Sequence, residues 1–154
     1  AKIRTGGLTP AAFPTAPQLA QVIAHLAQAK RPFKATAGLH HALPGHYPLS
    51  SHPESPVLPM QGFLNLAIAA AFAYHDPLSL QELETILASP SLRPFHFTAE
   101  VLQWEQRSLT LTQIHTARRQ FFQAFGSCSF QDPIHELAAL SLIPSSAQAL
   151  SALS

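Results

Sequence analysis

The sequence has few charged residues, a single cysteine and no long hydrophobic run. Charged residues make up 11% of its 154 residues, against about 25% in an ordinary soluble domain, while 47% are hydrophobic. So few charges indicate a surface that is partly covered, by a second copy in a homo-oligomer, by a partner chain or by a missing portion of the same protein. The chain opens on Ala1 rather than Met, which we interpret as a processed or truncated N-terminus.

These scarcities exclude several classes of protein. The lone Cys128 rules out an internal disulfide and fits the reducing cytoplasm. The net charge is +1 and the basic residues are scattered, so no nucleic-acid partner is expected. The most apolar stretch, residues 63–74, is interrupted by Asn65 and is shorter than the roughly 20 residues of a membrane-spanning helix. We therefore expect no membrane partner, and no signal peptide is visible.

The first 40 residues have the pattern of a strand, a helix and a second strand. The segment "AKIRT" precedes a Gly-Gly pair, and the apolar residues of "PTAPQLAQVIAHLAQAK" recur at helical spacing. Thr15 is a suitable N-cap, with Pro17 in the first turn. The segment "PFKATAG" then predicts the next strand. Strand, helix and strand together have the length of one βαβ unit, so the two strands should be parallel.

The rest of the chain continues a mixed α/β pattern. We expect a single α/β domain over residues 1–144 and a Ser/Ala-rich tail over 145–154. Within the domain the sequence predicts a proline-rich loop at 42–59, helices at 60–75, 79–88 and 112–125, an inserted β-hairpin at 95–111, a short strand in "GSCSF" and a last helix from Asp132. The 79–88 helix begins with a capping box formed by Ser79 and Glu82.

Two lysines occupy equivalent places on the two predicted parallel strands. Alternate side chains of a strand share a face, so Lys2 lies with Arg4, and Lys34 with Thr36 and Gly38. Two amines held together in a poorly solvated site depress each other's pKa, and a neutral lysine can then attack a carbonyl carbon. The alternative is that both lysines simply reach into water at the strand ends.

The motifs "KIRTGG" and "FKATAGL" resemble the sixth and seventh strands of Schiff-base aldolases of the deoxyribose-phosphate aldolase type. The resemblance implies the C-terminal half of a (β/α)8 TIM barrel, with Lys2 as the nucleophile and Lys34 as the partner that tunes its pKa. Thr5, Gly6 and Gly38 would line the strand ends, and together with Arg4 and Thr36 they are candidate ligand-binding residues. "FGSCSF" would correspond to the family's last strand and its phosphate-binding turn. The chain also resembles an uncharacterised bacterial family that shares the "KATAGLHH", "GFLN" and "FGSCSF" motifs.

Histidines gather around the end of the second strand. His40, His41, His46 and His52 fall within a short stretch, but their spacing matches no recognised zinc pattern, and we expect no metal or other cofactor. His40 and His41 would follow a strand's carboxyl end, where barrel enzymes gather catalytic groups, so they are candidates for acid–base catalysis. The alternative is that they are ordinary polar loop residues.

Three further features could contribute polar or nucleophilic groups to a site. Gly126, Ser127 and Ser129 precede a helix N-terminus and could bind an anion, although Asp132 would compete as a cap. Asn65, in an apolar helix, either fixes the strand-end loops or touches a ligand. Cys128 is either a nucleophile or a small buried hydrophobic residue.

Two functions remain open on the sequence. The first is a Schiff-base lyase or aldolase-like enzyme that acts on a phosphorylated or carboxylated carbonyl compound, with catalytic Lys2, Lys34, His40 and His41. The second is a non-catalytic structural or binding domain that works only with a partner chain or as an oligomer.

Overall fold

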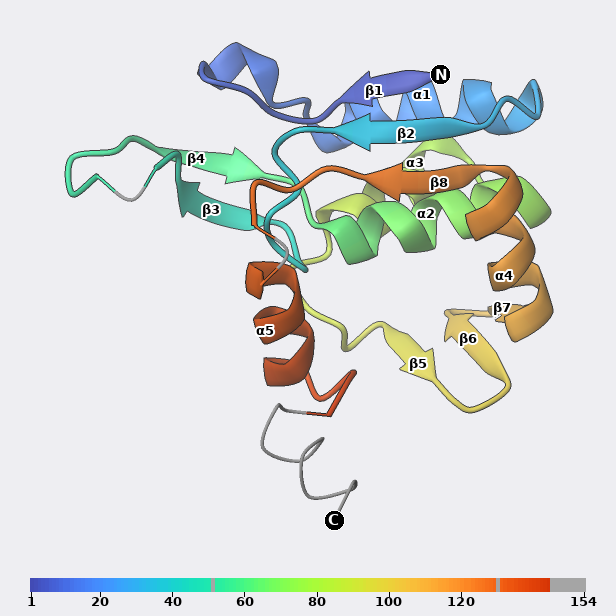
Figure 1. Cartoon of the computed structure of the whole chain (residues 1–154). Helices are drawn as coiled ribbons and strands as arrows, with labels where there is room; N and C mark the ends of the chain where they lie inside the picture. The colour runs from blue at the N-terminus through green and yellow to red at the C-terminus, as the bar shows by residue number, and fades with distance from the viewer. Residues whose placement is uncertain (51, 130, 145–154) are drawn as a thin grey trace.

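A small parallel sheet with helices on one side forms the centre of the molecule (Figure 1). The computed structural model describes residues 1–50, 52–129 and 131–144. The helices are the 3₁₀ helix η1 (Pro10–Ala12), α1 (Ala16–Gln28), α2 (Phe63–His75), α3 (Leu80–Ala88), α4 (Leu111–Gln120) and α5 (Gln131–Ala139). The strands are β1 (Lys2–Arg4), β2 (Phe33–Thr36), β3 (Gly45–Pro48), β4 (Val57–Met60), β5 (Phe95–Phe97), β6 (Val101–Trp104), β7 (Arg107–Thr110) and β8 (Phe122–Phe125).

The parallel sheet has the strand order β1-β2-β8. Lys2 pairs with Lys34 and Arg4 with Thr36, which confirms the predicted parallel βαβ unit. The α/β class is therefore confirmed. The part of the chain that the structure describes contains no closed barrel, however, because its parallel strands number three and its other strands form separate antiparallel sheets.

The two sides of the parallel sheet differ sharply. Phe33 and Ala35 of β2 are buried beneath the helices, where Phe33 stacks on Phe122 with ring centroids 5.0 Å apart. The helices α1, α2 and α3 lie together on the side of Phe33 and Ala35 (Figure 1). The opposite side of the sheet carries Lys2, Arg4 and Lys34, which are all exposed. Parallel sheets are normally covered on both faces. We call this uncovered side, with Lys2, Arg4, Lys34, Thr36 and Ala124, the open face.

Local sequence signals account for the helices that were predicted correctly. Thr15 and Gln18 form a capping box at the start of α1, with a proline in its first turn, and Ser79 and Glu82 do the same for α3. Helix α2 is buried on most sides, as its apolar sequence predicted, because α1, α3 and α4 all pack against it.

Three predicted elements differ from the structure in whole or in part. Residues 42–59 are not an unstructured loop, because they contain β3 and most of β4, which form an antiparallel pair. Pro48 and Pro59 are tolerated there since each strand of a two-stranded sheet has an unpaired edge. In residues 95–111 the predicted antiparallel hairpin is confirmed, but the segment holds three strands where two were predicted.

The third difference concerns the helix expected over 112–125. Helix α4 ends at Gln120, and Phe122–Phe125 form β8, the third strand of the parallel sheet. The short strand expected in "GSCSF" is consequently displaced, because the strand precedes this motif and Gly126–Ser129 form a loop after it. The Ser/Ala tail, 145–154, lies outside the described residues.

Candidate functional site

The carboxyl ends of β1, β2 and β8 meet at one edge of the parallel sheet (Figure 1). Ligands of open α/β sheets bind at this edge, since the loops that follow the strands converge there. In this chain the loops bring together His40 and His41 after β2, Ser127 after β8, and Glu136 from α5. We call these four residues the carboxyl-edge cluster.

Glycines allow the strand ends to come together. A Cβ atom on Gly6 would lie 2.5 Å from the Cα of Gly38, and Gly38 has a φ of +77°. Neither position therefore accommodates a side chain without a shift of backbone. Both glycines were predicted to line the strand ends, and the structure places them there as backbone contacts.

The two threonines fasten the same strand ends. The hydroxyl of the buried Thr5 donates to the carbonyl of Ala37 at 2.5 Å, and the hydroxyl of Thr36 donates to the carbonyl of Ile3 at 3.2 Å. Both hydroxyls, which the sequence placed among ligand-binding groups, are thus engaged in joining β1 to β2.

Glu136 holds His41 and the chain that follows it. Its Oε1 lies 2.7 Å from Nδ1 of His41, and its Oε2 accepts from the backbone N–H of Ala42 at 2.5 Å. The His41 ring is stacked on Tyr47 of β3, with centroids 3.4 Å apart. Burial and the nearby Glu136 carboxylate raise the pKa of Tyr47 above its usual value, so the phenol stays neutral and donates to the carbonyl of Leu43.

His40 faces the loop after β8. Its Nδ1 lies 2.9 Å from the hydroxyl oxygen of Ser127 and accepts from the backbone N–H of Cys128 at 3.4 Å. Burial lowers the pKa of His40, the neighbouring His41 lowers it further, and Asp132 acts in the opposite direction. The neutral imidazole is therefore favoured at neutral pH.

Other predicted site residues have structural partners. Ser129 accepts from the backbone N–H groups of Gln131 and Asp132 and so serves the first turn of α5. The side-chain amide of the fully buried Asn65, in the first turn of α2, donates to the carbonyls of Ile86 and Ser89. Asn65 therefore supplies hydrogen bonds to carbonyls at the end of α3, a role that the sequence did not predict.

The remaining predicted residues are exposed to solvent or have free space around them. Lys2, Arg4 and Lys34 lie on the open face, and Gly126 follows β8 with no backbone atom closer than 3.5 Å to a Cβ built on it. Cys128 is exposed, which excludes the buried hydrophobic role considered for it. His46 and His52 lie on β3 and in the turn beyond it. No group of three or more His, Cys, Asp or Glu residues suited to a metal ion occurs within residues 1–50, 52–129 and 131–144.

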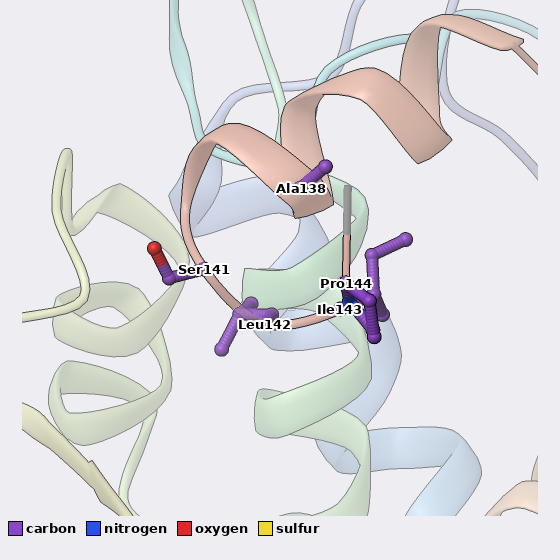
Figure 2. Close-up of a pocket in the computed structure, with 5 residues that line it drawn as sticks. All are labelled: Ala138, Ser141, Leu142, Ile143 and Pro144. Atoms are coloured by element: carbon purple, nitrogen blue, oxygen red, sulfur yellow. The ribbon is translucent and has the colours of Figure 1, made fainter. Parts of the chain in front are cut away.

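Two hollows lie elsewhere. A space of about 540 Å³ beyond the C-terminal end of α5 is lined by Ala138, Ser141, Leu142, Ile143 and Pro144 (Figure 2). None of these five side chains is titratable, so the hollow offers no acid–base chemistry. A smaller apolar hollow of about 230 Å³ lies between α2, α4 and the β5-β6-β7 sheet. Neither hollow includes the carboxyl-edge cluster, which lies where the carboxyl ends of the parallel strands meet.

Sequence reasoning missed Glu136 and Tyr47. Glu136 is 95 residues from His41 along the chain, and no spacing rule links positions so far apart. Comparison with protein-family models, curated proteins and solved structures gives no significant match. No helix in the described residues is long and apolar enough to cross a membrane.

Proposed function

We propose that this chain is part of a Schiff-base lyase, aldolase-like in its chemistry, which acts on a phosphorylated or carboxylated carbonyl compound. The observation that carries the proposal is the direct pairing of Lys2 with Lys34 across β1 and β2. Neighbouring strands lie about 4.8 Å apart, and both side chains belong to the open face. One small ligand can therefore touch both amines.

Arg4 supports the choice of an anionic substrate. It lies two residues beyond Lys2 on the same face of β1, next to Thr36 of β2. Guanidinium groups bind phosphate and carboxylate in a bidentate manner. An anionic group held by Arg4 would place the carbonyl carbon of a small substrate near the lysine pair.

The reaction needs one lysine as a neutral amine. The amine of Lys2 attacks the carbonyl carbon, and water leaves as the imine forms. In the protonated imine the bond between the α and β carbons then breaks, and its electron pair forms the C=C bond of an enamine. The hydroxyl group on the β carbon gives its proton to water, so the other fragment departs as an aldehyde or ketone. Protonation and hydrolysis of the enamine release the second product and restore the amine. Lys34 is the second cation beside the reacting group.

The open face supports a barrel-like assembly. Three parallel strands with helices on one side and cations on the other are what the C-terminal part of a (β/α)8 barrel would contribute. In a complete barrel the open face would point inward, where poor solvation strengthens imine chemistry. The missing cover would come from a further portion of the protein or from a partner chain.

Borohydride trapping tests the proposal. The full chain is incubated with small aldehydes and keto acids, reduced, and digested for peptide mass spectrometry. We expect an adduct on Lys2 or Lys34 that disappears in the corresponding Lys→Ala variant. The matched control is Lys30→Ala, because Lys30 donates to the carbonyl of Tyr74 and lies over its ring, away from the open face. Labelling spread evenly over all lysines, or no labelling, would rule out the imine.

A second candidate function is a binding domain without catalysis that works with another chain. It is favoured by the open face and by β1, which is an edge strand of the sheet. Proteins usually cover both faces of a parallel sheet and protect its edge strands. Three cations on this face would repel their copies across a two-fold interface, so an acidic partner suits it better than a second copy. Sedimentation tests whether two copies of the chain associate through the open face. A dimer that Lys34→Glu leaves intact would show that the open face is not the interface between the copies.

A further inference from the structure

His40 and His41 are adjacent in the chain but hydrogen-bonded to different kinds of partner. Nδ1 of His41 faces a carboxylate, Oε1 of Glu136, at 2.7 Å. A carboxylate in its ionised form only accepts hydrogen bonds, so Nδ1 of neutral His41 carries the ring proton. Its other nitrogen, Nε2, is then left with a free lone pair that can accept a proton.

His40 has the opposite arrangement. The backbone N–H of Cys128 only donates, and it points at Nδ1 of His40 at 3.4 Å. Nδ1 is therefore an acceptor, the ring proton of neutral His40 resides on Nε2, and the Ser127 hydroxyl donates to the same Nδ1 at 2.9 Å. The lowered pKa of His40, caused first by burial, is consistent with the neutral ring.

We infer that His40 and His41 form an acid–base pair that removes a proton next to a carbonyl group, with Glu136 as the positioning residue for His41. The inference goes beyond the imine chemistry proposed above, because it requires neither lysine. The ligand class is a small ketone or keto acid that carries a hydrogen on the carbon beside its carbonyl.

The proton transfer balances without a co-reactant. Nε2 of His41 takes the proton from the carbon, and the electron pair of the broken C–H bond forms a C=C bond. The carbonyl π pair moves to oxygen, which becomes an enolate. The Nε2–H of His40 donates a hydrogen bond to that oxygen and keeps its proton. Return of the proton from His41 to the same carbon regenerates the ketone.

The surroundings of His41 fix the ring before any ligand arrives. Glu136 is itself held by the backbone N–H of Ala42, and Tyr47 stacks on the ring face. The side chain of His41 is 23% exposed, so the ring is packed but still reachable from solvent. Rings held in this way lose little freedom in the transition state, which is what positioning residues contribute to catalysis.

The experiment is deuterium wash-in. The full chain is incubated in D₂O with pyruvate or with dihydroxyacetone phosphate, and the loss of the C–H signal is followed by proton NMR. We expect His41→Asn to reduce the exchange rate by about 100-fold or more. His46→Asn, which removes an exposed histidine from β3, is the matched control and should leave the rate unchanged. The double variant Lys2→Ala/Lys34→Ala separates exchange through the histidines from exchange through an imine.

Two readouts separate positioning from a purely structural role of Glu136. Glu136→Gln keeps the shape of the side chain, so we expect the variant to fold but to exchange more slowly and with an altered pH profile. Histidine ¹⁵N spectra should show the Nδ1–H form of His41 and the Nε2–H form of His40 in the wild type. In Glu136→Gln we expect the His41 signals to change and those of His40 to stay.

The outcomes divide the two proposals. No wash-in by the wild type with either probe, or full exchange in His41→Asn, would overturn the acid–base pair. Exchange that is lost in the double lysine variant would also overturn it and would instead support the imine route. Trapped imine together with unchanged exchange in His41→Asn would leave the lyase proposal standing alone.

Discussion

Gly6 and Gly38 are in backbone-to-backbone contact where β1 and β2 end. A Cβ atom on Gly6 would lie 2.5 Å from the Cα of Gly38, and one on Gly38 would lie 2.6 Å from the Cα of Gly6. This contact brings the two strand ends together just before the chain turns toward His40. The geometry of the carboxyl-edge cluster therefore depends on two residues that have no side chains.

Gly6→Ala should destabilise the protein, because the new methyl group meets backbone that cannot move aside easily. We expect the free energy of unfolding to fall by about 2–3 kcal/mol, measured by urea denaturation. Gly126→Ala is the matched control: a Cβ there lies 3.5 Å or more from its nearest neighbours, so the change should stay within about 0.5 kcal/mol. Equal effects of the two substitutions would contradict the close contact.

Replacement of Asn65 should have a large effect on the stability of the protein. Its side-chain amide donates to the carbonyls of Ile86 and Ser89 at 2.7 and 2.9 Å, and the residue is fully buried. Asn65→Ala removes both donors and leaves a cavity, so we expect a loss of about 3 kcal/mol in the free energy of unfolding. Thermal and urea denaturation measure it, and a change below about 1 kcal/mol would show that water replaces the lost amide.

Arg107 joins the β5-β6-β7 sheet to the helices. Its guanidinium donates to Asp76 just after α2 at 2.5 Å and to Glu82 in the first turn of α3 at 2.8 Å. Lysine cannot hold two carboxylates in this forked geometry. Because the groups are partly exposed, we expect Arg107→Lys to cost no more than about 1 kcal/mol.

Salt provides the check on Arg107. The difference in unfolding free energy between wild type and Arg107→Lys should shrink at about 1 M salt, where the screening length is about 3 Å. The uncharged site at Asn65 supplies the comparison, since the cost of Asn65→Ala should change little with salt. A cost of Arg107→Lys that is independent of salt would indicate lost packing instead of lost charge pairing.

Sequence patterns correctly predicted those helices and strands that are determined by residues close to one another in the chain. The helix α1 could be read from Thr15 and the spacing of its apolar residues, and α3 from its Ser79 and Glu82 capping box. The parallel arrangement of β1 and β2 followed from the length of one βαβ unit. In each case the residues that determine the structure lie within a short stretch of sequence.

Elements set by distant contacts could not be predicted in this way. The apolar pattern of α4 continues through Phe121 and Phe125, so the sequence favoured one long helix. The segment becomes β8 because β2 offers an unpaired edge, and Phe125 then stacks on Phe63 of α2. Glu136 was missed for the same reason, since only the folded chain brings α5 to His41.

The stability of the protein should depend on the protonation of His40. Burial and His41 lower its pKa in the folded state, with Asp132 opposing them, whereas the unfolded chain keeps a histidine pKa of about 6.5. As the pH falls through and below about 6.5, the unfolded state takes up a proton before the folded state does. The free energy of unfolding therefore decreases toward acid pH until folded His40 is also protonated, and the contribution is constant above that range.

Urea denaturation over the range from neutral to mildly acidic pH measures this effect. His40→Asn should flatten the decrease, because the variant has no imidazole to titrate at that position. His46→Asn removes an exposed imidazole from β3 and controls for the loss of one histidine. If wild type and His40→Asn lose stability in parallel as the pH falls, His40 is not held neutral by its surroundings, and the neutral ring required of it beside His41 would have to be abandoned.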